Sequence, residues 1–181
     1  MIYLLRGFLL CLIFYNCLSC NSSSQHISPP YVEMAAKIRS EVAHKLAKRH
    51  NMRIFGLGGG MADCVNFLGL DFQIQGPLSK EQLRRILIDS VQELLKAVNS
   101  DEQIRPFLKN YPFTEKEIMI TLFVIDKRGE NIYDPQIAVA TSGQGTMSYN
   151  TDDKDNKFVY KQKIKEDYQT ALKIINDENK K

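Results

Sequence analysis

Cys64 is the one cysteine that follows the apolar opening segment and its two closing cysteines, and its thiol could carry covalent chemistry. A thiol becomes a strong nucleophile when a neighbouring base such as histidine takes its proton. His44 and His50 are the upstream residues that could supply this base, but no signature of a thiol enzyme surrounds Cys64. We therefore expect both histidines to face solvent, and we keep a thiol enzyme as an alternative hypothesis.

The glycine-rich stretch GLGGG, residues 56–60, is the second candidate for chemistry. Glycine-rich loops bind phosphate when they follow a strand and open a helix. Here the pattern predicts a strand on both sides, Met61 stands where the third glycine of G-x-G-x-x-G belongs, and no Gly-Lys-Ser/Thr follows. We expect a turn or bulge that lets another group approach closely, and we predict no cofactor.

Residues that bind metals do not gather in this sequence. The histidines at 26, 44 and 50 include no pair four residues apart, which is the spacing that places two ligands on one helix face. The acidic run Asp152-Asp153-Lys154-Asp155 lacks the glycine and the final glutamate of a calcium loop. The sequence thus predicts no catalytic, cofactor-binding or metal residue.

The opening stretch MIYLLRGFLLCLIFYNCLSC carries a different kind of chemistry. Arg6 precedes an apolar segment, residues 7–15, whose length is typical of a signal peptide. This segment is shorter than the roughly 20 apolar residues that a spanning helix needs. It is followed by Cys17-Leu18-Ser19-Cys20, which resembles the lipobox of bacterial lipoproteins.

The resemblance implies that residues 1–19 are a signal peptide and that Cys20 is the lipidation site. In that family the cysteine sulfur receives a diacylglycerol, a signal peptidase cuts before the cysteine, and the new amine takes a further acyl chain such as palmitate. Ser19 and Leu18 fit the family's pattern, while Cys17 replaces its common leucine. An ordinary secretory signal would show an A-x-A-like site, which is missing, and an uncleaved helical anchor stays open as an alternative.

The composition of the stretch NSSSQHISPP, residues 21–30, predicts a polar tether between Cys20 and the rest of the chain. Asn21 is not an aspartate, which by analogy with enteric bacteria favours the outer membrane. After cleavage and lipidation only Cys64 would keep a free thiol, so no disulfide is expected within the mature chain. The expected organisation is a signal peptide (1–19), a lipidated cysteine with its tether (20–30) and one α+β domain (31–181).

Composition and net charge limit the classes of partner that this domain is expected to bind. The 181 residues include 44% hydrophobic and 25% charged residues, as in ordinary globular proteins. The net charge of +3 comes from 24 basic and 21 acidic residues, and such a balance argues against a nucleic-acid partner.

Apolar periodicity predicts the elements of the domain. Helices are expected at 31–51, from Ser79 to about residue 98, as a short piece at 102–109, and near the end, where Ile164 and Ile175 belong to one apolar stripe. Strands are expected at 52–57, 64–74, 118–126, 136–141 and 146–149. The first two strands should form a hairpin, and the strand at 118–126 is apolar on both sides, which predicts that both of its faces are covered.

This order, α-β-β-α-β-β-β-α, predicts an α+β two-layer sandwich with a mainly antiparallel sheet of about five strands and three main helices. The leading hypothesis is a cell-envelope lipoprotein whose partners are the lipid bilayer, through Cys20, and another envelope protein. We expect a binding or assembly module without catalysis. The alternatives are a membrane-tethered enzyme that uses Cys64 and the 56–60 glycine loop, and a module that binds peptides by strand addition at residues 52–57 or Tyr149.

Overall fold

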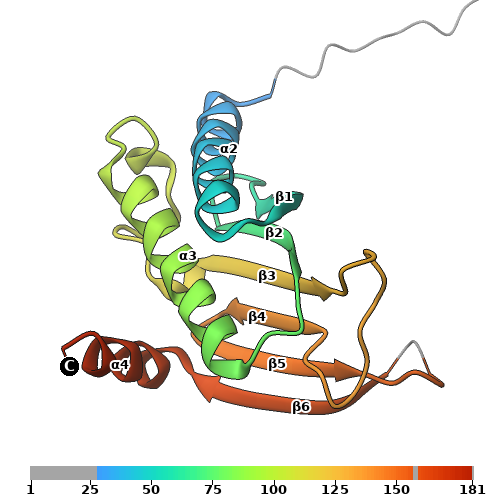
Figure 1. Cartoon of the computed structure of the whole chain (residues 1–181). Helices are drawn as coiled ribbons and strands as arrows, with labels where there is room; N and C mark the ends of the chain where they lie inside the picture. Colours follow the sequence, from blue (N-terminus) through green and yellow to red (C-terminus); the bar gives the residue numbers. More distant parts are fainter. Residues whose placement is uncertain (1–27, 157–158, 181) are drawn as a thin grey trace, which may run out of the picture.

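Two long helices cover one face of a six-stranded sheet in the computed structural model, which describes residues 28–156 and 159–180 (Figure 1). The elements are α2 (Pro30–His50), β1 (Arg53–Gly60), β2 (Phe67–Gln75), α3 (Lys80–Ser100), β3 (Ile118–Ile125), β4 (Val139–Gly143), β5 (Thr146–Asp152), β6 (Tyr160–Asp167) and α4 (Tyr168–Glu178), with 3-10 helices at Arg105–Phe107 and Glu115–Glu117. The predicted α+β class and element order are confirmed, with one strand more than expected. The signal segment 1–19 and Cys20 lie outside the described residues.

Strand order in the sheet follows chain order from β1 to β6. β1 and β2 form the predicted antiparallel hairpin. The connection through α3 makes β3 parallel to β2, because the chain must cross over the sheet before it can pair again. From β3 to β6 each strand is antiparallel to the one before it.

The core lies between the sheet and the helices α2 and α3. The stripe predicted on the first helix is buried there, with Ala35 and Leu46 fully enclosed. Leu94 from α3 and Leu122 from β3 are also fully enclosed. Burial of these side chains supplies the main driving force for folding, at about 1.5–3 kcal/mol for each large aliphatic side chain.

The expected start of the last helix is wrong, and a strand that was not expected precedes it. Ile164 lies in the strand β6 and not in a helix, and the last helix starts only at Tyr168. The side chain of Asp167 caps this helix, since its Oδ1 accepts a hydrogen bond of 2.9 Å from the backbone N–H of Thr170. The strand was missed because seven of its eight residues, YKQKIKED, are polar or exposed aromatic and give no apolar alternation.

The start of α3 forms a reciprocal capping box, as the sequence predicts. Ser79 Oγ accepts from Gln82 N–H at 3.2 Å, and Gln82 Oε1 accepts from Ser79 N–H at 2.9 Å. We expect Ser79→Ala to lower the free energy of unfolding by about 1 kcal/mol, measured by urea denaturation. Ser100→Ala at the other end of the helix is the matched control and should change it by less than about 0.5 kcal/mol. Equal losses for both variants would contradict the capping role.

Candidate functional site

Cys64 lies between β1 and β2 with a partly buried thiol. Its Sγ is 3.9 Å from Asn66 Oδ1, a weak contact with an amide and not with a base. His44 Nδ1 is 2.7 Å from the carbonyl of Ser40, and His50 Nε2 is 2.7 Å from Asp89. Within the described chain, no hydrogen bond joins either histidine to this thiol. His50 is partly buried against α3, so the expectation that it faces solvent holds only for His44.

The glycine stretch 56–60 belongs to β1 and pairs with β2, so the expectation of a turn between two strands is wrong. A bulge does occur just before it, between Ile54 and Gly56. Because β1 continues into a loop and then a strand, its glycines open no helix and lack the geometry of a phosphate loop. The expectation that another group approaches this stretch closely is confirmed. A Cβ on Gly59 would lie 2.9 Å from the carbonyl oxygen of Phe67 and 3.0 Å from Arg39 Nη1.

Met61, the carbonyl of Phe67 and Arg39 together leave no room for a side chain at position 59 of the edge strand β1. This arginine extends from α2, is only 9% exposed, and donates from Nη1 to the carbonyl of Gly58 and from Nε to the carbonyl of Ala35. Burial lowers the pKa of its guanidinium. Its hydrogen bond to Gly58 joins α2 directly to the backbone of the sheet edge, where a side chain at position 59 would interfere.

A matched pair of substitutions tests this packing. Gly59→Ala should lower the free energy of unfolding by about 1–2 kcal/mol, because the new methyl group would force Met61, Phe67 and Arg39 to move. Gly58→Ala should change it little or raise it slightly, because nothing lies within 4 Å of its Cβ position. Thermal unfolding of both variants measures the difference, and a Gly58→Ala loss as large as that of Gly59→Ala would contradict the account.

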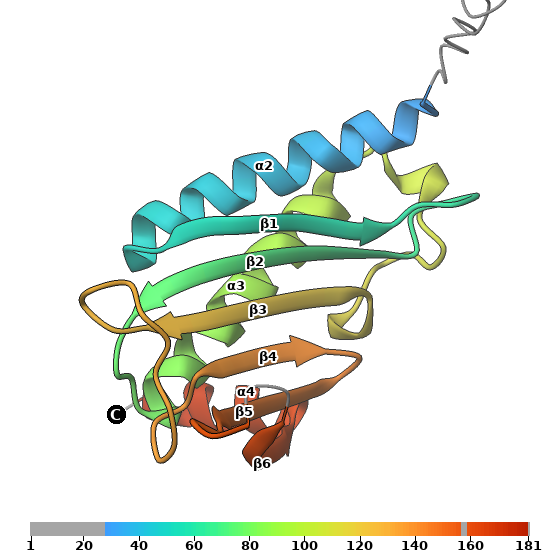
Figure 2. The ribbon, with the colours of Figure 1, turned by 90° about the vertical axis from the view of Figure 1, so that its right-hand side faces the viewer.

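The second face of the sheet carries no described helix, as Figure 2 shows with the sheet in front of α3. Side chains of β3 alternate between the two faces, so Ile120 is fully buried while Met119 is 40% exposed. The expectation that both faces of this strand are covered is therefore wrong. On the same uncovered face, the rings of Phe55 and Phe123 pack edge to face at 5.2 Å, with Phe55 57% exposed. Their shared exposure on one face makes this face the candidate binding surface of the described chain.

A polar row crosses this uncovered face from strand to strand. The register places Asp71 opposite Thr121, Thr121 opposite Thr141, Thr141 opposite Ser148, and Ser148 opposite Lys165. The hydroxyl oxygens of Thr141 and Ser148 are 2.7 Å apart. Cross-strand neighbours of this kind have Cβ atoms about 5 Å apart, so the row presents the carboxylate of Asp71, three hydroxyl groups and the ammonium group of Lys165 at regular intervals.

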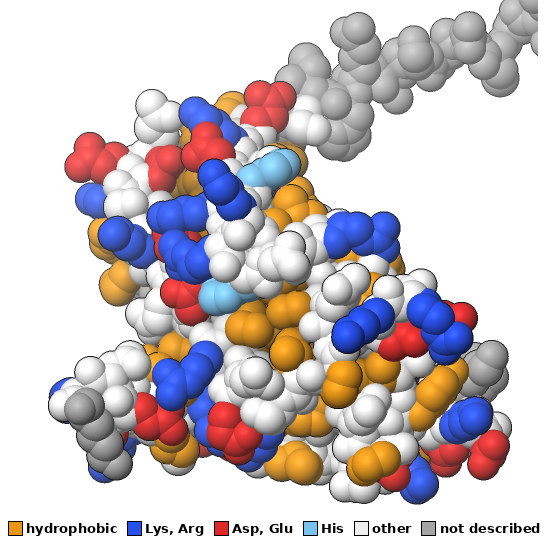
Figure 3. Space-filling model, in the orientation of Figure 1, with side chains coloured by type: hydrophobic (Ala, Val, Ile, Leu, Met, Phe, Trp, Pro, Cys, Tyr) orange, Lys and Arg blue, Asp and Glu red, His pale blue; other side chains and the backbone are white. Residues whose placement is uncertain are grey.

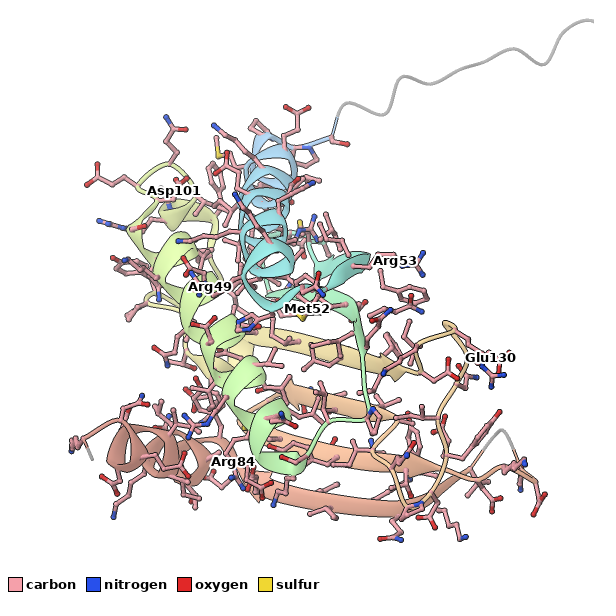
Figure 4. The ribbon with its side chains drawn as sticks, viewed as in Figure 1. Arg49, Met52, Arg53, Arg84, Asp101 and Glu130 are labelled. Carbon is pink, nitrogen blue, oxygen red and sulfur yellow. The ribbon has the colours of Figure 1, made fainter. Side chains whose placement is uncertain are left out.

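A second set of charged residues lies on the helical side of the sheet and joins α3 to β6 near the position of Arg84 in Figure 4. Arg84 donates to both carboxylate oxygens of Glu166, at 2.9 and 2.8 Å, and Tyr149 Oη donates to Glu166 at 2.6 Å. Lys80 Nζ lies 3.1 Å from the same carboxylate. Burial acts to raise the pKa of Glu166, but the hydrogen bonds from Arg84, Tyr149 and Lys80 outweigh it and lower this pKa to about 2.

Ion pairs also join α2 to α3 on the surface. Arg49, labelled in Figure 4, contacts Asp89 and Glu93 of α3 at 2.6 and 2.7 Å. Lys45 contacts Glu93 at 2.6 Å, and His50 contacts Asp89 at 2.7 Å. Figure 3 shows charges of both signs mixed over these helices. The charges of these groups are paired with one another, which indicates a role in helix packing and not in ligand binding.

Neither set of charged residues was predicted, because each joins positions far apart in the sequence. Arg84 and Glu166 are separated by 82 residues, so no pattern of nearby residues predicts their contact. The polar row depends on strand register, and the register of β6 could not be predicted because β6 has no apolar alternation. A row of alternate threonines and serines in neighbouring strands is the one signal that could have suggested it.

Tyr149, expected as an edge residue for strand addition, is fully buried in β5 between β4 and β6. The described residues contain no group of three or more His, Cys, Asp or Glu side chains placed to hold a metal ion. Over the same part of the chain, no helix is both long and apolar enough to cross a membrane. No protein-family model matches the chain, and neither a curated protein nor a solved structure matches it.

Proposed function

We propose that this protein is a bacterial cell-envelope lipoprotein, held on a membrane, with the outer membrane favoured, by acyl chains on Cys20. The observation that carries the proposal is the sequence Cys17-Leu18-Ser19-Cys20 directly after the apolar segment 7–15. Each buried CH₂ contributes about 0.8 kcal/mol to membrane binding, so two or three acyl chains anchor a protein stably where one holds it only transiently.

The distance between the lipid and the folded part follows from the sequence. Helix α2 starts at Pro30, ten residues after Cys20. A fully extended chain of that length reaches at most about 35 Å. The domain would therefore remain within one domain diameter of the bilayer surface, where it can meet other envelope components.

The folded part serves as a binding or assembly module without catalysis, and its partner is another envelope protein. The uncovered face of the sheet supports this role, because it exposes Met119, Phe55 and Lys165 together with a row of hydroxyl groups. By contrast, the carboxylate with the most strongly lowered pKa, Glu166, is held by three donors beneath α3 and faces the helical layer. That arrangement serves packing, and it leaves the uncovered face for binding.

Metabolic labelling tests the proposed location. Bacteria that express the full chain are grown with an alkyne-tagged fatty acid, and the purified protein is examined for the tag after strong denaturation. We expect covalent labelling, and an inhibitor of the lipoprotein signal peptidase should cause a larger, still labelled precursor to accumulate. An unlabelled protein of full length would overturn the proposal.

A further inference from the structure

A shallow groove crosses one end of the uncovered face, beside the β4–β5 hairpin. It consists of two adjoining cavities of about 230 and 310 Å³, which share Met119 and Gln144 in their linings. The first cavity reaches toward Asn66 and Lys109, and the second reaches Lys165 on the edge strand β6. The groove therefore runs across the strands from β2 to β6.

The groove has an excess of positive charge. Lys109, Lys116 and Lys165 line it and are exposed, and among the described residues none of the three has a carboxylate within 4.0 Å. Glu117 is the acidic residue in the lining, and it already accepts hydrogen bonds from Thr114 and Asn110. Within the two linings, three ammonium groups thus face this one carboxylate, while Asp71 lies beside Thr121 on β2 and lines neither cavity.

Hydrogen-bond donors accompany these ammonium groups. The hydroxyls of Thr121, Thr141 and Ser148 line the second cavity, in the same cross-strand row as Lys165. Ammonium and hydroxyl groups side by side can donate charge-assisted hydrogen bonds to a carboxylate, and these are stronger than bonds between neutral groups.

The middle of the groove is apolar. Met119, shared by both cavities, is 40% exposed, and Phe67 in the first cavity is 36% exposed. A methionine side chain adapts its shape to different apolar partners. The groove therefore offers cationic groups at its two ends and an apolar contact between them.

We propose that this groove binds an extended acidic peptide segment of a partner protein, with carboxylates on the lysines and an apolar side chain on Met119. The four strand spacings from β2 to β6 measure about 19 Å, the length of about six extended residues. This inference rests on the proposed function, since it names the chemistry of the partner that the binding module recognises. The apolar contact between two cationic ends matches a peptide with an apolar side chain between its carboxylates, whereas a polysaccharide offers no apolar side chain and a bilayer buries its acyl chains beneath the headgroups.

Fluorescence anisotropy tests this inference on the detergent-extracted full chain. The probe is a fluorescent hexapeptide with two aspartates at each end and two leucines in the middle, and the control probe carries asparagines in place of the aspartates. We expect the acidic peptide to bind, binding to weaken with added salt, and the control probe to bind at least tenfold more weakly.

The charge-reversal variants Lys116→Glu and Lys165→Glu should each weaken binding of the acidic peptide at least threefold, and the double variant at least tenfold. Lys173→Glu on α4 makes the same change in net charge as either single variant at a residue that lines neither cavity, and it should leave affinity within twofold. Met119→Asp should also abolish binding, with circular dichroism confirming that each variant is folded.

Equal weakening by Lys173→Glu would overturn the inference, since it would indicate a general charge effect. So would groove-dependent binding of phosphatidylglycerol vesicles or heparin without binding of the peptide. If the peptide fails to bind while the protein still carries fatty acid, the groove inference fails and the proposed anchoring at Cys20 stands. If the peptide binds but no fatty acid is present, the opposite holds.

Discussion

Replacing Glu166 with glutamine should lower the free energy of unfolding by about 3 kcal/mol at pH 7. The side chains of Arg84 and Glu166 are only 8% and 12% exposed, so neither charge is well solvated by water. Removing the carboxylate leaves the guanidinium of Arg84 buried without a compensating charge, and it also weakens the hydrogen bond from Tyr149. Urea denaturation of the purified variant measures the loss.

The neighbouring pair Arg85–Glu178 provides the matched control. It also joins α3 to the C-terminal segment, but its side chains are 49% and 38% exposed. Glu178→Gln should therefore cost less than about 1 kcal/mol, as surface ion pairs do. Similar losses for the two variants would contradict the claim that enclosure makes the Arg84–Glu166 pair important.

The same pair makes stability depend on pH. In the unfolded chain a glutamate titrates near pH 4.3, whereas in the folded protein the pKa of Glu166 is lowered to about 2. A lowered folded-state pKa stabilises the protein above the unfolded-state pKa, and this contribution is lost as the pH falls toward the folded-state pKa. The difference in unfolding free energy between wild type and Glu166→Gln should hold from pH 7 to about pH 5 and shrink between about pH 5 and pH 2. A difference that is unchanged at pH 2.5 would contradict this assignment.

The variant Cys20→Ala should abolish both lipid attachment and cleavage of the signal segment. Without the thiol no diacylglycerol can be attached, and we expect unprocessed protein that takes up no fatty acid. Cys17→Ala is the matched control, because it removes a thiol three residues away and should leave lipidation at Cys20 intact. Gel mobility and fatty-acid labelling of both variants measure the effect. Labelling that survives Cys20→Ala but not Cys17→Ala would place the lipid on the other cysteine.

Local chemistry made the helices predictable. The capping box of Ser79 and Gln82 depends on residues three positions apart, and the stripe of the first helix repeats every three to four residues. All the residues that form such patterns lie within a few positions of one another in the sequence. They placed α2 and α3 close to their observed bounds.

The sheet was harder to predict, because its strands contact segments that lie far away in the sequence. The glycines of 56–60 suggested a turn because glycine is rare in strands, yet they pair with β2, and Gly59 lies against Arg39. The apolar residues Met119 and Phe123 suggested a second covering layer, whereas they line a face that no described helix covers. The ammonium of Lys165 joined the candidate site only once β6 was paired with β5. Exposed apolar side chains on a one-sided sheet are thus easily mistaken for core when only periodicity is available.

Intact-mass analysis of the native protein extracted from bacterial membranes tests the central claim most directly. The account predicts a polypeptide that begins at Cys20 and carries the added mass of a diacylglycerol, with or without a third acyl chain. A full-length polypeptide without added mass, recovered from the soluble fraction, would contradict it.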